Sequence, residues 1–153
     1  MSASPEVPSG SHQGAHHHDH APVRHEGPQP VVYALQTDLS LGAAEPQSAE
    51  ELLGALRELL GGLLAALRDG GCSLIGHVKG MVDAGDLGRA FFSVTSFRGA
   101  PSFNGSIDGP IARCRLTLNV IVFGIDESSV EAAVREALSL HFALWRAGGG
   151  TPH

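Results

Sequence analysis

The chain has 153 residues, 42% of them hydrophobic and 17% charged, with 16 acidic against 10 basic side chains and a formal net charge of −6. This length suits one domain with a single core, and an acidic surface that carries only one lysine argues against nucleic acid as a partner. No apolar run approaches the roughly 20 residues of a membrane span, and residues 1–30 lack a signal-peptide core, so we expect a cytoplasmic protein with no membrane partner.

Residues 1–30 differ in composition from the rest of the chain. They hold five of the nine prolines and six of the nine histidines, with several serines and glycines and almost no large apolar side chain. Such a segment cannot bury enough surface to offset the entropy lost on folding, so we expect it to be disordered. The predicted organisation is a His/Pro-rich tail at 1–30, one folded domain at 31–147 and a flexible Gly-rich C-terminus at 148–153.

The histidines of this tail are the strongest chemical signal in the sequence, and four of them stand in the run HHHDH around Asp19. Neutral imidazole is a good ligand for Ni²⁺, Zn²⁺ and Co²⁺, and a flexible segment can gather several rings around one ion. Binding should be modest, because the segment loses entropy, and it should weaken below about pH 6 as the rings take up protons. The candidate metal ligands are His12, His16, His17, His18, His20 and His25.

Two other interpretations of the run stay open. Histidine-rich low-complexity tails arise by drift and then do nothing beyond interacting with solvent. A purification tag is the other source, although a tag usually presents six uninterrupted histidines and this run is interrupted. The ability to bind a metal is therefore a firmer prediction than its purpose.

After the tail, the pattern predicts a strand and then a long helix. Val31–Leu41 alternates in the manner of a strand and suits the edge of a sheet. Ser48 and Glu51 form a capping-box pair, and leucines then recur at spacings of three and four until Gly70 and Gly71 end the helix. Interior glycines cost about 1 kcal/mol each in a helix, so we expect a neighbouring element to approach closely at each of them. These glycines are Gly54, Gly61 and Gly62.

The centre of the chain, from Cys72 to Ile125, is typical of β-strands joined by glycine-rich turns. Ser73–Val82 and Arg89–Phe97 flank the turn sequence DAGDLG and should form a hairpin. A short segment at Phe103–Asp108 is a candidate for a further strand. The last two-thirds of Ile111–Ile125 should be a central, buried strand.

Alternation along these strands predicts one sheet face that mixes polar and apolar side chains. The polar groups are His77, Lys79, Ser93, Thr95, Thr117 and Asn119, and the apolar groups beside them are Ile75, Met81, Phe91, Phe97, Ile121 and Phe123. The polar groups either satisfy one another on a half-solvated face or form a ligand, metal or subunit-contact site. In the second case His77, Lys79 and Asn119 are the candidate cofactor-binding residues.

A second amphipathic helix should follow, capped by Asp126 or Ser128, with Ser128 and Glu131 as another capping-box pair. Its apolar stripe should run to Trp145 before the glycines at Gly148 stop it. The stripe consists of Val130, Val134, Leu138, Phe142 and Trp145. His141 lies beside the stripe, where a packed or boundary histidine is the expected role.

This order of elements predicts an α+β two-layer sandwich: a three- to four-stranded antiparallel meander, with one possible extra strand before it, flanked by two amphipathic helices on one face. The helix, three strands, helix order is similar to that of double-stranded-RNA-binding domains in topology alone. Where those domains carry a basic cluster, the second helix here begins DESSVEAAV. The charge therefore argues against that function.

Two helices do not easily cover both faces of such a sheet. The apolar side chains around His77 would then lie in water, and monomers rarely expose large contiguous apolar patches. We therefore expect a homo-oligomer that pairs through this face, most simply a two-fold dimer.

No catalytic signature is present. The chain contains no GxSxG, GxxxxGK[ST] or HExxH motif and no GxGxxG opening a helix, and His77 has no acidic partner nearby in the sequence. We assign no catalytic residue and favour a protein that is not an enzyme. Cys72 and Cys114 lack CxxC spacing, which favours two buried thiols, and a disulfide between them stays open if their strands align.

The function predicted from these observations is that of a small soluble metal-binding accessory protein. Its tail would handle or store a divalent transition metal (Ni, Zn or Co) and pass it to a metal-receiving protein partner. Two alternatives stay open. One is a homo-oligomeric structural module with an inert tail, and the other is a small-molecule-binding domain or enzyme with a site around His77, Lys79 and Asn119.

Overall fold

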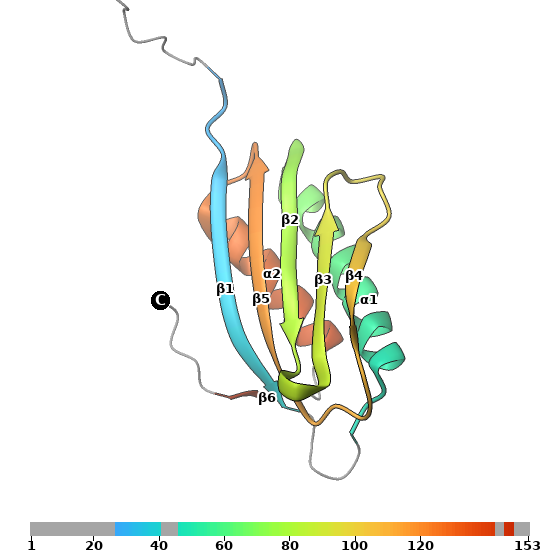
Figure 1. The fold of residues 1–153 in the computed structure, drawn as a ribbon. Coiled ribbons are helices and arrows are strands. Elements are labelled where there is room, and N and C mark those ends of the chain that lie inside the picture. Colours follow the sequence, from blue (N-terminus) through green and yellow to red (C-terminus); the bar gives the residue numbers. More distant parts are fainter. Residues whose placement is uncertain (1–26, 41–45, 143–145, 149–153) are drawn as a thin grey trace, which may run out of the picture.

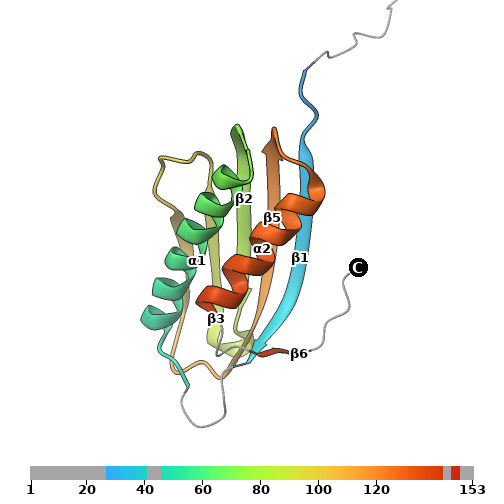
Figure 2. The same ribbon diagram turned by 180° about the vertical axis from the view of Figure 1, so that it is seen from behind.

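Both helices of this protein pack on one face of a single antiparallel β-sheet, as Figure 1 and Figure 2 show from opposite sides. The computed structural model describes residues 27–40, 46–142 and 146–148. The fold is α+β, as predicted, with five long strands, a short sixth strand and two helices. In chain order these are β1 Val31–Ser40, α1 Ala49–Asp69, β2 Leu74–Asp83, the 3₁₀ turn Gly85–Leu87, β3 Gly88–Val94, β4 Ser102–Ile107, β5 Arg113–Phe123, α2 Glu127–His141 and β6 Arg146–Gly148.

The strands lie in the order β4-β3-β2-β5-β1-β6, so the sheet is a simple meander only from β2 to β4. After β4 the chain returns across the sheet, and β5 pairs with β2 on one side and β1 on the other. The prediction of a continuous meander was wrong at this step. The central position of β5 follows from its apolar alternation, because a strand between two partners can bury its whole inward-facing row under the helices. That row consists of Cys114, Leu116, Leu118, Val120 and Val122.

Helix α1 begins as its sequence predicts. The Ser48 side chain accepts a hydrogen bond from the Glu51 backbone N–H, and the Glu51 carboxylate accepts one from the Ser48 backbone N–H. Seven leucines of α1 are buried against the sheet and α2. Of the interior glycines, only Gly62 has the expected close neighbour, since a Cβ there would lie 2.6 Å from Nε2 of His141. Gly54 and Gly61 face open space, so that prediction was wrong for both.

Helix α2 begins at one of its two predicted caps but differs from its prediction in the capping box and at its C-terminal end. Asp126 is the N-cap and accepts from the Ser129 backbone N–H, while Ser128 donates to Asp126. The expected capping box is absent, because the Glu131 carboxylate pairs with Arg135 at 2.7 Å instead. The helix ends at His141, and Arg146–Gly148 pairs with β1 as β6. Trp145 and residues 149–153 lie outside the described part of the chain.

A β-bulge in β2 changes which side chains face the helices. The register of β2 against β5 shifts between Ile75 and His77, at Gly76. Because a one-residue shift moves a side chain to the other face, Ile75 is buried in the core and Leu74 is 57% exposed, the reverse of the predicted pattern. Phe97 also packs on the helix side, where its ring lies 4.7 Å from the Arg68 guanidinium carbon. Ile75 and Phe97 were both wrongly assigned to the face that carries His77.

Two glycines test this packing in opposite directions. A Cβ at Gly80 would overlap the Phe92 ring and the Thr117 carbonyl oxygen, so Gly80→Ala should lower the free energy of unfolding by about 1–3 kcal/mol. A Cβ at Gly54 meets nothing within 4 Å, and Gly54→Ala should raise the free energy of unfolding by about 0.5–1 kcal/mol. Urea unfolding of both variants measures the difference. Equal effects of the two substitutions would contradict the described packing.

Candidate functional site

The predicted metal ligands fall in a part of the chain that the structure does not describe. His12, His16, His17, His18, His20 and His25 all precede residue 27. Among the described residues there is no group of three or more His, Cys, Asp or Glu side chains arranged to hold a metal ion. We call the segment that holds these histidines, residues 12–25, the arm.

The second candidate site, at His77, Lys79 and Asn119, lies on the sheet face opposite the helices, which we call the open face. Lys79 of β2 stands directly between Asn119 of β5 and Ser93 of β3 in the strand register. His77 lies opposite Ile121, one row away, which is about 7 Å along the strand. The structure thus brings Lys79, Asn119 and Ser93 into one row. Lys79 and Asn119 are exposed and His77 is half-buried, so solvent can satisfy their polar groups.

The open face also carries apolar side chains, as the alternation predicted. Val32 is 60% exposed and Phe91 is 48% exposed, and both lie on this face. Met81, Ile121 and Phe123 on the same face are half-buried. The open face therefore mixes polar and apolar side chains.

A row of alternating charges crosses four strands of the open face, and the sequence analysis did not find it. Asp38 of β1 is opposite Arg115 of β5, Arg115 is opposite Asp83 of β2, and Asp83 is opposite Arg89 of β3. Arg115 Nε donates to Asp38 Oδ1 at 2.8 Å, and Arg89 Nε donates to Asp83 Oδ2 at 3.1 Å. We call these four residues the charge row. Finding it requires the strand order, because its members are far apart in sequence.

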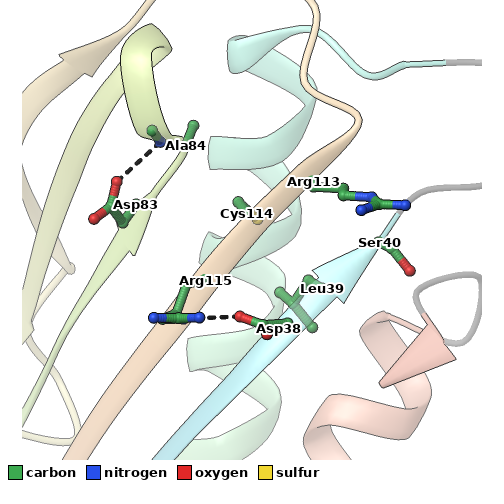
Figure 3. A pocket seen from close by; sticks show the side chains of 9 residues that line it. Asp38, Leu39, Ser40, Asp83, Ala84, Arg113, Cys114 and Arg115 are labelled. Carbon is green, nitrogen blue, oxygen red and sulfur yellow. Dashed lines mark hydrogen bonds and ion pairs between the residues drawn. The ribbon is translucent and has the colours of Figure 1, made fainter. Parts of the chain in front are cut away.

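A pocket of about 680 Å³ lies beside the charge row, at the end of the sheet where β1 and β2 finish and β5 begins (Figure 3). Figure 3 shows the Arg115 and Asp38 side chains joined across the strands, with Arg113 directed toward Ser40. The pocket is lined by two carboxylates, of Asp38 and Asp83, and by two guanidinium groups, of Arg113 and Arg115. It therefore presents no single sign of charge to a ligand. It is lined by Asp38, Leu39, Ser40, Asp83, Ala84, Gly85, Arg113, Cys114 and Arg115.

The two cysteines are free and buried, as predicted. Burial, followed by the neighbouring charge of Asp38, raises the pKa of the Cys114 thiol to about 12. A thiol with such a pKa stays protonated near neutral pH and is neither a good nucleophile nor a good metal ligand. Cys114 is therefore a core residue in this fold.

His141 occupies the boundary position predicted for it. Its ring packs against Gly62 of α1, and its Nδ1 lies 3.9 Å from a carboxylate oxygen of Glu58. The contact joins the end of α2 to the middle of α1. His141 therefore has a packing role and is distant in the sequence from the arm.

Comparison with known proteins finds a partial likeness to solved structures and no family. No family model matches the chain, and no curated protein matches it. Among solved structures, it is similar to part of the Zn(II)-bound YjiA GTPase from E. coli and to part of a Zn(II)-bound triple mutant of YjiA GTPase. In both cases the identity is 17%, the TM-score is 0.33, and the match covers 69% of this chain but only 29% of the other. No described helix is long and apolar enough to cross a membrane.

The pairing of Asp38 with Arg115 makes a measurable prediction about acid titration. The hydrogen bond from Arg115, reinforced by its charge, lowers the pKa of Asp38 below its ordinary value of 3.8. In Arg115→Gln the pKa of Asp38 should rise back toward 3.8, because the charged donor is gone. Carboxyl chemical shifts from NMR follow each Asp separately.

Asp126 is the internal control for this titration. Its pKa is lowered by hydrogen bonds from Ser129 and Ser128 at the start of α2, so it should be the same in both proteins. An Asp38 midpoint that does not change in Arg115→Gln would contradict the described ion pair.

Proposed function

We propose that this protein handles a divalent transition metal ion, Ni²⁺, Zn²⁺ or Co²⁺, through its histidine-rich arm. The observation that carries the proposal is the run HHHDH at residues 16–20, with further histidines at 12 and 25. Several imidazoles in one short segment can share an ion without a preformed cage, and the carboxylate of Asp19 adds an oxygen ligand.

The composition of the folded domain agrees with a metal site in the arm. Its described residues offer no competing group of three metal-binding side chains, and both of its thiols are buried. Metal taken up by the arm would therefore not move to a site within the described part of the domain. The domain would then act as the soluble carrier that presents the arm to other proteins.

A short histidine-rich arm suits exchange of the ion with a partner protein. A segment that must become ordered around its ion binds with moderate affinity, and its ligands can be replaced one at a time. We propose that the recipient is a metal-receiving protein with more preorganised ligands. Such a partner would take the ion because its site loses less entropy on binding.

One described histidine, His77, lies near the start of β1 in the sheet. The arm precedes β1, whose Val32 lies opposite Ile121, and Ile121 lies opposite His77. His77 is therefore on the open face, at the end of the sheet where β1 begins. His77→Ala therefore tests whether this side of the sheet contributes a ligand.

The full-length chain and two variants test the proposal by calorimetric titration with Ni²⁺, Zn²⁺ and Co²⁺ at pH 7.5. Substituting His16, His17 and His18 together by Ala should weaken binding by about tenfold or more, which corresponds to about 1.4 kcal/mol or more. His77→Ala is the matched control and should bind like the unchanged chain. Binding should also fall as the pH decreases through about 6.5, where imidazole takes up a proton.

The other outcomes distinguish the remaining functions. Unchanged binding in the triple-Ala variant, or no binding by the full chain, would contradict a metal function of the arm. Loss of binding in His77→Ala alone would instead favour a site on the open face around His77, Lys79 and Asn119.

A further inference from the structure

The open face has the features of a surface that is covered in the working protein. Both helices pack on the other face (Figure 2), so no described element shields this one. Large apolar side chains are nevertheless exposed on it, with Val32 at 60% and Phe91 at 48%. Stable monomers rarely expose broad apolar patches, so a partner is expected here.

The charge row indicates which partner fits. Along the row the signs alternate from Asp38 to Arg115, Asp83 and Arg89. The centre of the row lies between β5 and β2. Each charge on one side of this centre has the opposite sign to the charge at the same distance on the other side. A surface of this kind is complementary to a second copy of itself after a half-turn about that centre.

We propose that two copies of this chain form a dimer through their open faces, about a two-fold axis that runs parallel to the strands between β2 and β5. A half-turn about this axis places β2 over the partner's β5 and β3 over the partner's β1. Asp83 then faces the partner's Arg115, and Arg89 faces the partner's Asp38. All four charges of each row meet an opposite charge.

The same operation matches the uncharged rows. Lys79 faces the partner's Asn119, whose side-chain carbonyl can accept from the ammonium group, and Met81 faces the partner's Thr117. Ile121 faces the partner's His77. The polar row of Ser93, Lys79 and Asn119 thereby becomes part of a subunit contact.

Other placements of the axis do not give this agreement. An axis that runs along β2 itself would place β5 over the partner's β3, so Arg115 would face the partner's Arg89. Like charges across an interface cost several kcal/mol and reject that arrangement. The charge row therefore selects one axis as well as one face.

The area and geometry suit a reversible dimer. Four strands about 4.8 Å apart, each contributing about 8 residues at about 3.4 Å, give a patch of about 500 Å² per copy. Two such patches bury roughly 1,000 Å² in total, near the lower limit of specific interfaces. An axis parallel to the strands leaves the two sheets nearly aligned, which is a common way for sheets to pack. The β1 strands of the two copies then begin at the same end of the dimer.

Two charge-swap variants of the full chain test the face and the axis together. The first is Asp38→Arg with Arg115→Asp, and the second is Asp83→Arg with Arg89→Asp. Each swap keeps the ion pair within its own chain, and each places one pair of like charges side by side between β5 and β2, so the two variants are matched for folding. Circular dichroism and thermal unfolding check this.

The mass of each sample is measured by light scattering and sedimentation over a range of concentrations, with a chelator present so that metal cannot link two arms. The unchanged chain should dimerise reversibly. Either variant alone places like charges opposite one another at all four positions and should dimerise at least about tenfold more weakly, equivalent to about 1.4 kcal/mol. An equal mixture of the two variants restores every opposite pair and should dimerise like the unchanged chain.

Three results would overturn the proposal. The first is an unchanged chain that stays monomeric at the highest concentration reached, a result that does not depend on whether the variants fold. The second is a variant that dimerises as well as the unchanged chain. The third is a mixture that fails to regain the dimer, which would exclude the proposed axis. None of these results depends on metal binding by the arm.

Discussion

Packing of the two helices against one face of the sheet is the interaction on which the rest of this structure depends. Helix α1 contributes seven buried leucines, and β5, at the centre of the sheet, contributes an inward-facing row that is buried throughout. A buried leucine stabilises a fold by about 1.5–3 kcal/mol relative to an exposed one, so this layer supplies most of the stability. Because side chains alternate along a strand, the same packing directs every second residue to the opposite face.

That constraint separates the chain into a core that maintains the fold and two regions free for function. The open face carries an ion-paired row, an exposed lysine between Asn119 and Ser93, and apolar side chains that water does not favour. The arm carries the histidines. Pairing of two open faces would remove the apolar groups from water and place the starts of both β1 strands at one end of the dimer. The structural and the metal-handling proposals are therefore compatible, although each is tested without the other.

Local signals in the sequence predicted much of the fold, and long-range geometry accounts for what they missed. The capping pair Ser48 and Glu51 and the leucine spacing identified α1, and the DAGDLG turn identified the β2–β3 hairpin. The bulge at Gly76 is signalled by a glycine inside a strand pattern, but strict alternation assigned Ile75 to the wrong face. The charge row was not found because Asp38 and Arg115 are 77 residues apart and meet only through the order of the strands. For the arm, the prediction of metal binding depends on its histidine-rich composition alone.

The measurement that tests this two-faced organisation most directly is NMR of methyl-labelled full-length protein with a soluble paramagnetic probe, at several protein concentrations. Methyl groups in the core, such as those of Leu118 and Val120, should be protected from the probe at every concentration. Those of Met81, Thr117 and Ile121 on the open face should be protected at high concentration and become accessible on dilution. Open-face methyl groups that stay equally accessible at all concentrations would contradict the account.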